Sequence, residues 1–316
     1  MSGPQIITRK PKALRKGSKI ATFAPASPSD RMDLFAGIEE LRRLGFDVEP
    51  PFEYDSEGYF AASAEERGEE FLSSVQNPFV EGMIASRGGY GSNYLLESDL
   101  QAELPEPKCI VGFSDLTTFQ IYLWQKAGWV TFHGPMASAG FNNGANRVQG
   151  YDEDSFMNAV TNTASGLAVN LDGESLAAGE AEGRLLGGCL TLVQATIGTP
   201  WELDFADAIL LLEDRGMKPY QVDRVLMHLK QAGKFRDVRG IVLGEFPDGT
   251  PSVEASPTIR EVCERILTPL GIPVVWGAPV GHTNRPMLTI PLGVRARLES
   301  DGPGLLDILE PAVVDE

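Results

Sequence analysis

The chain has 316 residues, 42% of them hydrophobic and 22% charged, a balance typical of globular proteins with one or two domains. Its 27 basic and 44 acidic residues give a net charge of −17, which argues against nucleic acid and anionic membrane surfaces as partners. No stretch is long and apolar enough to span a membrane, and no apolar core of an export signal follows the basic first twenty residues. Cys109, Cys189 and Cys263 stand far apart beside apolar residues, so we expect buried thiols in a cytoplasmic protein.

Strand-like and helix-like segments alternate over the first half of the chain. Five segments have the composition of buried strands: 19–25, 46–50, 81–86, 108–113 and 129–135. Helices are predicted between them, and three have clear periodicity or ends: 34–44, 64–76 and 115–127. This alternation predicts an α/β fold with a doubly wound, mostly parallel sheet.

The pattern changes after residue 140. Residues 141–180 are rich in Gly, Asn, Ser and Thr around one predicted helix near 153–162, as in a connection between domains. Strand-like runs separated by glycines follow, with one clear helix among them at 219–232. The runs are 180–187, 208–213, 240–246, 273–280, 287–293 and 294–300. We therefore expect an N-terminal α/β domain over 1–165, a linker over 166–180 and a β-rich domain over 181–316.

A general base that works near neutral pH has few candidates, because the chain holds three histidines. His228 lies off the apolar stripe of its predicted helix, which indicates a surface residue. His133 stands at the end of a predicted strand and fits a buried structural role. His282 lies in the loop sequence VGHTNRPM, where its role stays open on composition alone.

Two polar groups stand where a predicted strand ends. Ser114 and Asp115 follow 108–113 and precede a helix, where α/β enzymes place a nucleophile and where any protein places a helix cap. Glu213 follows five apolar residues, so it caps the next turn or faces a site. A serine nucleophile needs an imidazole to take its proton and a carboxylate to orient that imidazole, which His282 and Glu213 supply. The order Ser, Glu, His also occurs in α/β-hydrolases, although Leu116 replaces the second glycine of their nucleophile elbow.

The sequence RGGYG at 87–91 forms a glycine-rich loop after a predicted strand. A tight turn is one interpretation, and backbone N–H groups that bind an anion or oxyanion are another. The segment lacks the third glycine of a dinucleotide fingerprint, and the sequence has no Gly-rich loop with the Lys-Ser/Thr of a nucleoside triphosphate site. His-x-x-x-His and Cys-x-x-Cys spacings do not occur either, so we expect no metal and no cofactor.

Several motifs in one order resemble the LD-carboxypeptidases, which are serine peptidases acting on cell-wall peptides. These motifs are GFSDLTTF, SRGGYGSNYLL, GRLLGGCLTLVQATIGTPWELDFADAILLLEDRG, KPYQVDRVLMHLKQAGKF, GIVLGEF and PVGHTNRPMLTIPLG. The opening KPKALRKGSKIATFAPAS matches the family as well, so the resemblance spans nearly the whole chain. It implies a flavodoxin-like N-terminal domain that carries the nucleophile and a β-rich, swivelling barrel-like C-terminal domain that carries the acid and the base.

Carried over by motif, the resemblance implies a catalytic triad of Ser114, Glu213 and His282. The implied reaction passes through an acyl-enzyme. It cleaves the bond between the L-centre of a diamino acid and the terminal D-alanine of a murein tetrapeptide, in a cleft between the domains.

The resemblance also implies how the oxyanion and the substrate are held. Backbone N–H groups of Gly89, or of Gly88, and of Asp115 would form the oxyanion hole, near a helix N-terminus. The Asp115 side chain would then be a structural acid in the first helical turn. Arg87 and Arg215 are candidates for binding the terminal carboxylate of the substrate, although Arg215 fits a pair with a neighbouring acid equally well.

Three other functions stay open at the level of the sequence. Some family members hydrolyse a peptide–nucleotide antibiotic and confer self-immunity, and they differ in the substrate pocket. Residues 185–189 and 197–201 look more like the murein-recycling members, but Cys189 replaces an expected asparagine. The chain could instead bind muropeptides without cutting them, or be an esterase of the α/β-hydrolase kind. The missing elbow glycine and the β-rich half argue against an esterase.

Family members often form homodimers, so a homodimer is a further expectation.

Overall fold

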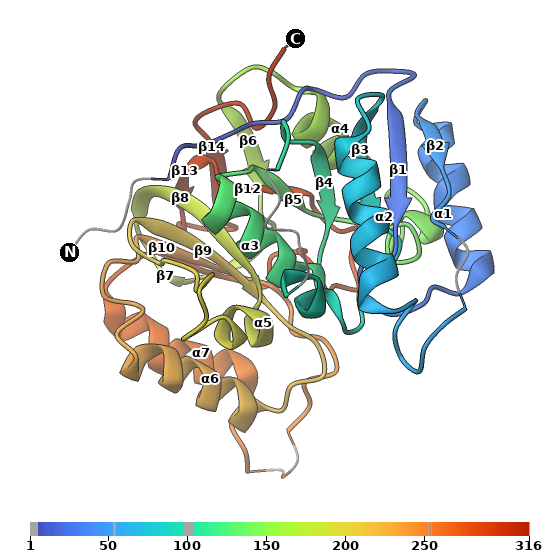
Figure 1. Cartoon of the computed structure of the whole chain (residues 1–316). Helices are drawn as coiled ribbons and strands as arrows, with labels where there is room; N and C mark the ends of the chain where they lie inside the picture. The colour runs from blue at the N-terminus through green and yellow to red at the C-terminus, as the bar shows by residue number, and fades with distance from the viewer. Residues whose placement is uncertain (1–5, 53–54, 98–103, 252, 254, 316) are drawn as a thin grey trace. The chain divides into compact units, whose positions relative to one another are not determined.

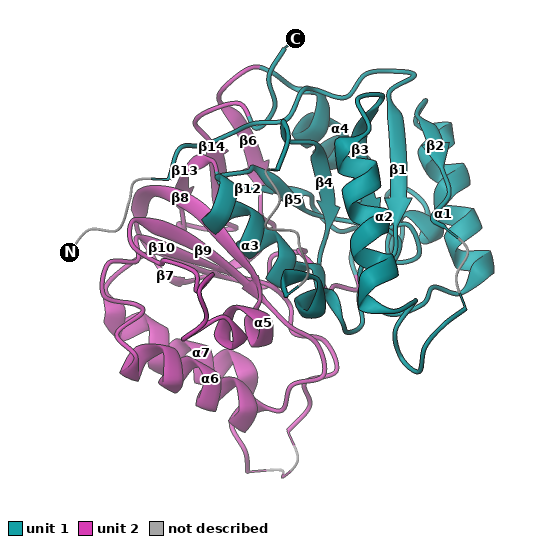
Figure 2. Cartoon of the chain, in the orientation of Figure 1, with its two compact units in different colours: residues 1–163, 285–293, 312–316 teal, residues 164–284, 294–311 magenta. Residues whose placement is uncertain are grey.

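The computed structural model describes residues 6–52, 55–97, 104–251, 253 and 255–315. The chain divides into two units, coloured in Figure 2: unit 1 contains 1–163, 285–293 and 312–316, and unit 2 contains 164–284 and 294–311. We expected domains over 1–165 and 181–316, whereas two segments of the C-terminal half, 285–293 and 312–316, are grouped with unit 1. The expected linker, 166–180, carries two strands of the unit 2 sheet.

Unit 1 contains a six-stranded sheet in the order β12-β5-β4-β3-β1-β2 (Figure 1). Five of these strands are parallel: β1 (Lys19–Phe23), β2 (Asp47–Glu49), β3 (Val80–Ala85), β4 (Cys109–Gly112) and β5 (Thr131–His133). The sixth, β12 (Ile290–Leu292), pairs antiparallel with β5. The order 2-1-3-4-5 of the parallel strands is that of flavodoxin-like folds, so the predicted doubly wound α/β class is confirmed.

Four helices of the described chain belong to unit 1. They are α1 (Arg31–Arg43), α2 (Ala64–Gln76), α3 (Leu116–Ala127) and α4 (Glu153–Thr161), with 3-10 turns η1 (Ser92–Leu96) and η2 (Phe141–Asn143). Asp30 accepts hydrogen bonds from the first turn of α1, and Ser63 and Glu66 form a capping box at α2. Gly128 ends α3 in the left-handed conformation. Strand β4 is buried along its whole length, as a central parallel strand covered by helices requires.

Unit 2 contains an eight-stranded mixed sheet in the order β6-β14-β13-β8-β9-β10-β11-β7. Its parallel part is β8 (Glu180–Cys189), β9 (Ala208–Glu213), β10 (Gly240–Leu243) and β11 (Val274–Trp276). Antiparallel strands flank it: β6 (Leu167–Asn170), β7 (Glu174–Ala177), β13 (Arg295–Glu299) and β14 (Leu305–Ile308). The expected β-rich C-terminal part is therefore present, but the run at 287–293 forms β12 of unit 1 rather than a strand of this sheet.

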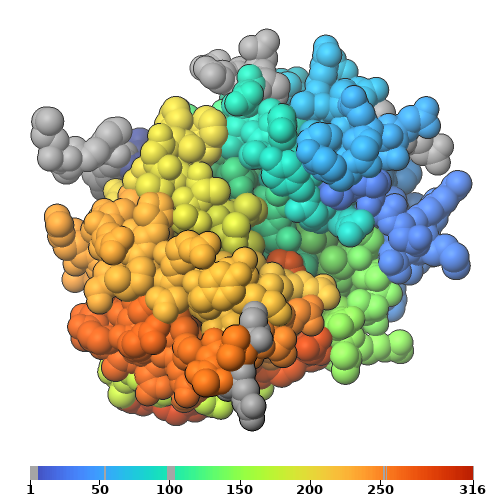
Figure 3. Space-filling model, turned by 90° about the horizontal axis from the view of Figure 1, so that it is seen from below, coloured from blue at the N-terminus to red at the C-terminus, as the bar shows by residue number. Residues whose placement is uncertain are grey.

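The helices of unit 2 are α5 (Leu190–Ala195), α6 (Pro219–Gln231) and α7 (Ile259–Leu267), followed by the 3-10 turn η3 (Thr268–Leu270). Helices α6 and α7 pack against each other, and Arg265 forms an ion pair with Asp223 across them. Their light and dark orange surfaces lie side by side in Figure 3. The sequence analysis predicted α6 and missed α7.

Within the described part of the chain, the longest helices fall short of the length and hydrophobicity that crossing a membrane requires. The three cysteines are buried thiols, as expected.

Candidate functional site

Ser114 lies in the turn that joins the buried strand β4 to α3 in unit 1. Its φ is +59°, a left-handed conformation that a residue with a side chain adopts only at a cost in energy. Gly112 makes the turn sterically feasible, because a Cβ there would lie 2.4 Å from Cδ2 of Leu116. The backbone therefore has the strained strand-to-helix geometry of a nucleophile elbow, although Leu116 stands where the elbow sequence has a second glycine.

The glycine-rich loop runs directly alongside this turn. A Cβ placed on Gly88 would lie 2.9 Å from Cβ and 3.1 Å from Oγ of Ser114, and 3.4 Å from the backbone N of Asp115. Gly89 has a φ of +106°, and a Cβ there would lie 2.3 Å from Oγ of Ser27. The lack of a side chain at Gly88 thus lets the loop backbone approach the Ser114 hydroxyl, and unit 1 brings three predicted site residues together: Ser114, Gly88 and Asp115.

The Asp115 side chain makes structural contacts with the neighbouring loop rather than with its own helix. Asp115 is the N-cap residue of α3, but its carboxylate makes no capping bond to that helix. Instead, Oδ2 accepts a hydrogen bond of 2.7 Å from the backbone N–H of Ser92, and Oγ of Ser92 donates to the Asp115 carbonyl at 2.5 Å. Burial raises the pKa of Asp115, while the bonds from Ser92 and the charge of Arg67 oppose that rise. The carboxylate therefore fixes the loop beside the serine.

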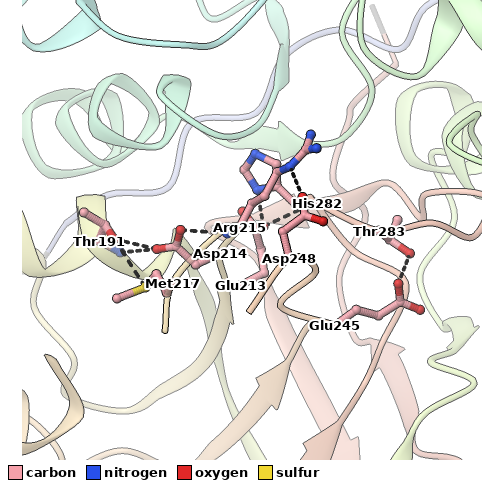
Figure 4. Close-up of polar contacts among 9 residues, drawn as sticks. All are labelled: Thr191, Glu213, Asp214, Arg215, Met217, Glu245, Asp248, His282 and Thr283. Atoms are coloured by element: carbon pink, nitrogen blue, oxygen red, sulfur yellow. Dashed lines mark hydrogen bonds and ion pairs between the residues drawn. The ribbon is translucent and has the colours of Figure 1, made fainter. Parts of the chain in front are cut away.

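Unit 2 brings Glu213 and His282 into contact, as Figure 4 shows. Glu213 is the last residue of β9 and is fully buried. Its Oε2 lies 2.7 Å from Nδ1 of His282 and accepts a second bond, of 2.9 Å, from the backbone N–H of His282. Two bonds from one residue to one oxygen fix the orientation of the imidazole ring.

Two glycines make room for the Glu213 side chain. A Cβ on Gly281 would lie 2.3 Å from Cδ of Glu213, and one on Gly244 would lie 2.6 Å from its Cβ. Gly281 also has a φ of +59°, which favours glycine on conformational grounds. The backbone therefore packs closely against the Glu213 side chain. This close approach explains why a glycine precedes His282 in the motif GHT.

The environment of His282 favours its protonated form. Burial by itself would lower the pKa of the imidazole, but the charge and hydrogen bond of Glu213, helped by Asp214, outweigh burial and raise the pKa above 6.5. Arg215 opposes that rise. An imidazolium stabilised in this way is what a general base needs once it has taken a proton.

Two neighbouring carboxylates were not assigned a role by the sequence analysis. Oδ2 of Asp214 accepts bonds from the backbone N–H of Thr191 at 2.9 Å and from its hydroxyl at 2.6 Å, so Asp214 holds the start of α5. Glu245 follows β10 and accepts a bond of 2.7 Å from the hydroxyl of Thr283, next to His282 (Figure 4). The sequence signal that could have identified Asp214 and Glu245 is the one that identified Glu213, namely an acid at or just after the end of a buried parallel strand.

Cys189 lies next to Glu213, because the ends of β8 and β9 pair in register. Burial, together with the charges of Glu213 and Asp214, raises the pKa of its thiol well above the ordinary value. The thiol therefore stays protonated and forms a hydrogen bond with Asp214. Asparagine was expected at position 189 from the family resemblance. The protonated Cys189 thiol, like an asparagine amide, is a neutral group beside the acidic residues.

The two arginines proposed for substrate binding make different contacts. Arg215 is 62% exposed, and its Nε donates at 2.8 Å to Asp248, an acid 33 positions away. Arg87 is exposed and donates from Nη1 to the Pro28 carbonyl at 2.9 Å.

The other two histidines have different partners. His133 is buried at the end of β5 beside the ring of Phe113, and Nδ1 of His228 lies 3.0 Å from the Gln194 amide. Among the described residues, no group of three or more His, Cys, Asp or Glu side chains is arranged to hold a metal ion.

Comparison with known proteins agrees with the motifs. The chain matches the description "LD-carboxypeptidase N-terminal domain" over residues 20–134 and "LD-carboxypeptidase C-terminal domain" over residues 182–298. It is 32% identical over 304 residues to the "Probable murein peptide carboxypeptidase" of Bacillus subtilis, covering 95% of this chain and 94% of that protein. It is 29% identical to the "Microcin C7 self-immunity protein MccF" of Escherichia coli, covering 91% and 92%.

Solved structures give the same picture. The muramoyltetrapeptide carboxypeptidase from Oxalobacter formigenes superposes with a TM-score of 0.79 at 30% identity, covering 94% of this chain and all of that one. The microcin C7 self-immunity protein MccF in complex with aspartyl sulfamoyl adenosine superposes with a TM-score of 0.87 at 26% identity, covering 96% and 99%.

Proposed function

The chain belongs to the LD-carboxypeptidase family, and from that premise we propose that it is a serine carboxypeptidase that releases the terminal D-alanine of murein tetrapeptides. Relatives named for murein peptides and for muramoyltetrapeptides cover nearly the whole chain. The observation that carries the proposal is the buried Glu213–His282 pair, in a chain whose family motif supplies a serine on a strained turn.

The proposed mechanism assigns one task to each group. Nε2 of His282 takes the proton of the Ser114 hydroxyl as Oγ attacks the carbonyl carbon, and Glu213 stabilises the resulting imidazolium. Backbone N–H groups of Gly89, or Gly88, and of Asp115 stabilise the oxyanion. The proton then passes to the amine of D-alanine, which leaves, and water hydrolyses the acyl-enzyme by the same steps.

Arg87 and Arg215 are proposed to bind the terminal carboxylate of the peptide. A guanidinium supplies parallel N–H donors that match a carboxylate, and a carboxypeptidase must distinguish a free terminus from an internal residue. The exposure of both side chains supports their availability to a ligand.

The test is to follow D-alanine release from a defined murein tetrapeptide. Wild type is compared with Ser114→Ala, Glu213→Ala and His282→Ala, and we expect losses on the order of 10⁴-fold or more for the serine and the histidine. A wild-type protein that binds the tetrapeptide without cutting it would make the chain a muropeptide-binding protein. An ester hydrolysed in preference to the peptide would favour an esterase.

A second candidate function is hydrolysis of a peptidyl or aminoacyl nucleotide, as in antibiotic self-immunity. The high TM-score to the structure of a self-immunity protein bound to an aminoacyl sulfamoyl nucleoside favours it. The two functions share the catalytic residues, so kcat/KM for a murein tetrapeptide and for an aminoacyl nucleotide, measured on one preparation, decides between them.

We further propose that the protein works in the cytoplasm as a homodimer. Three buried thiols support a reducing compartment. The dimer rests on the family, and light scattering coupled to size exclusion tests it, since a monomeric mass would refute it.

A further inference from the structure

One peptide group in the glycine-rich loop lies between two buried charges. Nη1 of Arg67 donates to the carbonyl of Gly91 at 2.9 Å, and the N–H of Ser92 donates to the Asp115 carboxylate at 2.7 Å. The Gly91 carbonyl and the Ser92 N–H belong to the same peptide group. Its dipole therefore points its negative end at a cation and its positive end at an anion, and both hydrogen bonds are strengthened by charge.

Arg67 also holds the segment on the other side of the loop. It is 1% exposed, and besides Gly91 it donates to the carbonyls of Pro25 and Ala62. Two residues after Pro25, Ser27 donates its N–H to the Gly88 carbonyl at 3.2 Å, and its Oγ accepts from the N–H of Tyr90 at 3.2 Å. The loop beside Ser114 is thus fixed on both sides by segments that Arg67 connects.

Arg67 is a buried cation that donates to three carbonyl groups, and its guanidinium also lies over the ring of Phe60, 5.0 Å from the ring centroid. Burying a charge in this way costs free energy, which calls for a reason. Burial lowers the pKa of Arg67, and the charges of Asp115 and Glu57 partly restore it. An apolar residue would avoid this cost, but it could not bind three carbonyl groups from three segments. The charge on Asp115 also lies on the residue that directly follows the proposed nucleophile.

We propose that Arg67 and the Asp115 side chain are positioning residues for the oxyanion hole, acting through the Gly91–Ser92 peptide that both bind. Neither side chain touches a reacting atom in the proposed mechanism. Together they set where the N–H groups of the 88–91 loop stand relative to the Ser114 hydroxyl. The inference rests on the proposed function for its catalytic consequence, but the positioning itself has a test that needs no substrate.

The first measurement is D-alanine release by Arg67→Lys and Asp115→Asn. Lysine keeps the charge but cannot reach three carbonyl groups in the fan that a guanidinium allows, so kcat should fall roughly 10²-fold with little change in KM. Asparagine keeps one acceptor oxygen and loses the charge, which should lower kcat roughly 10-fold. Because both residues hold one peptide, the double variant should lose less than the product of the single losses.

A matched control is Tyr151→Phe, which removes a part-buried bond of 2.8 Å to Glu40 and one of 3.2 Å from Arg43 elsewhere in unit 1. Its effect on kcat should be small and should multiply with that of Arg67→Lys. The substrate-free measurement is amide hydrogen exchange, which should rise over residues 87–92 in both positioning variants and stay unchanged there in Tyr151→Phe.

The outcomes separate the two proposals. Unchanged exchange over 87–92, or an unchanged kcat in folded Arg67→Lys and Asp115→Asn, overturns the positioning role. If Arg67→Lys does not fold, the same two readouts on Asp115→Asn decide. If wild type releases no D-alanine but exchange over 87–92 rises as expected, the positioning of the loop stands and the proposed function fails.

Discussion

The ends of β4 and β9 each present a side chain with a proposed catalytic role at the carboxyl end of a buried parallel strand, but they hold it by different means. Ser114 is placed by its backbone, which turns through a φ of +59° and lies against a loop of glycines. Glu213 has an ordinary strand backbone and is placed by burial, by two bonds from His282 and by the close approach of Gly244 and Gly281.

The difference follows from what each group has to do. A serine side chain is short, so the backbone must aim Oγ and the next N–H at one carbonyl group, and conformational strain achieves this. A carboxylate that orients a histidine needs a low-dielectric environment and fixed partners. At Ser114, therefore, backbone strain and chemistry can be separated by mutation, whereas at Glu213 packing, charge and orientation change together.

The largest effect is expected at Ser114, the proposed nucleophile. Ser114→Ala and Ser114→Gly should both lose on the order of 10⁴-fold or more in kcat, because each removes Oγ. Glycine tolerates a positive φ, so Ser114→Gly should be more stable than Ser114→Ala. The expected difference in the free energy of unfolding is about 1 kcal/mol. Urea denaturation of the two inactive variants measures this difference. Equal stabilities would mean that the turn is not strained and would remove one side of the comparison.

Next in size is the loss of charge at the orienting acid. Glu213→Gln keeps the side-chain volume, and kcat/KM should fall by roughly 10³ to 10⁴-fold, since the amide can favour the wrong imidazole tautomer. A loss below tenfold at every pH would show that His282 does not depend on Glu213.

The same substitution changes the dependence on pH. Glu213 raises the pKa of His282, and the base must be neutral to act, so the acidic limb of kcat/KM should move to lower pH in Glu213→Gln. Because the pKa of His282 is higher in the folded than in the unfolded state, protonation of His282 stabilises the fold. This stabilisation is complete below a pH of about 6.5 and is lost as the pH rises through the folded-state pKa. NMR titration of the His282 ring in wild type and variant checks the direction.

A smaller loss is expected where only packing around Glu213 changes. Gly281→Ala would bring a Cβ to 2.3 Å from Cδ of Glu213, and the displaced carboxylate should lower kcat/KM roughly 10²-fold. Gly277 is the matched control, because it also has a positive φ, +79°, with no atom within 4 Å of an added Cβ. Gly277→Ala should lower the thermal stability about as much as Gly281→Ala does, because both place alanine at a positive φ. Its kcat/KM should stay nearly normal. Equal kinetic losses in both variants would point to strain rather than to Glu213.

Local sequence patterns predicted the two strand ends and the candidate residues. Hydrophobic periodicity and composition can be read from short segments, and the scarcity of histidine leaves few candidates for the base. They could not place the run at 287–293, since an apolar strand reads alike in either sheet and its pairing with β5 is a long-range choice. They also could not reveal the φ of Ser114, because Leu116 obscures the elbow sequence. The bonds of Arg67 to Pro25 and Gly91 join residues 42 and 24 positions away.

One omission was avoidable. Helix α7 begins with a capping box of Thr258 and Glu261 ahead of an apolar stripe, a signal that is present in the sequence. Chemistry suggested that Glu213 and His282, 69 positions apart, could act together, and the family resemblance then assigned them to one triad.

The smallest effect is expected at Arg215, which adjoins the Glu213 end of the comparison but shares neither its burial nor its packing. Arg215 and Asp248 are 62% and 60% exposed, so breaking their pair should change the free energy of unfolding by less than about 1 kcal/mol. If Arg215 binds the terminal carboxylate, Arg215→Ala should raise KM roughly 10-fold and leave kcat unchanged, because the contact is equal in ground and transition states. Asp248→Ala, which keeps the guanidinium and removes its acidic partner, should leave KM unchanged or lower it. A normal KM in Arg215→Ala, with a raised KM in Arg87→Ala, would assign the carboxylate to the glycine-rich loop of unit 1 instead.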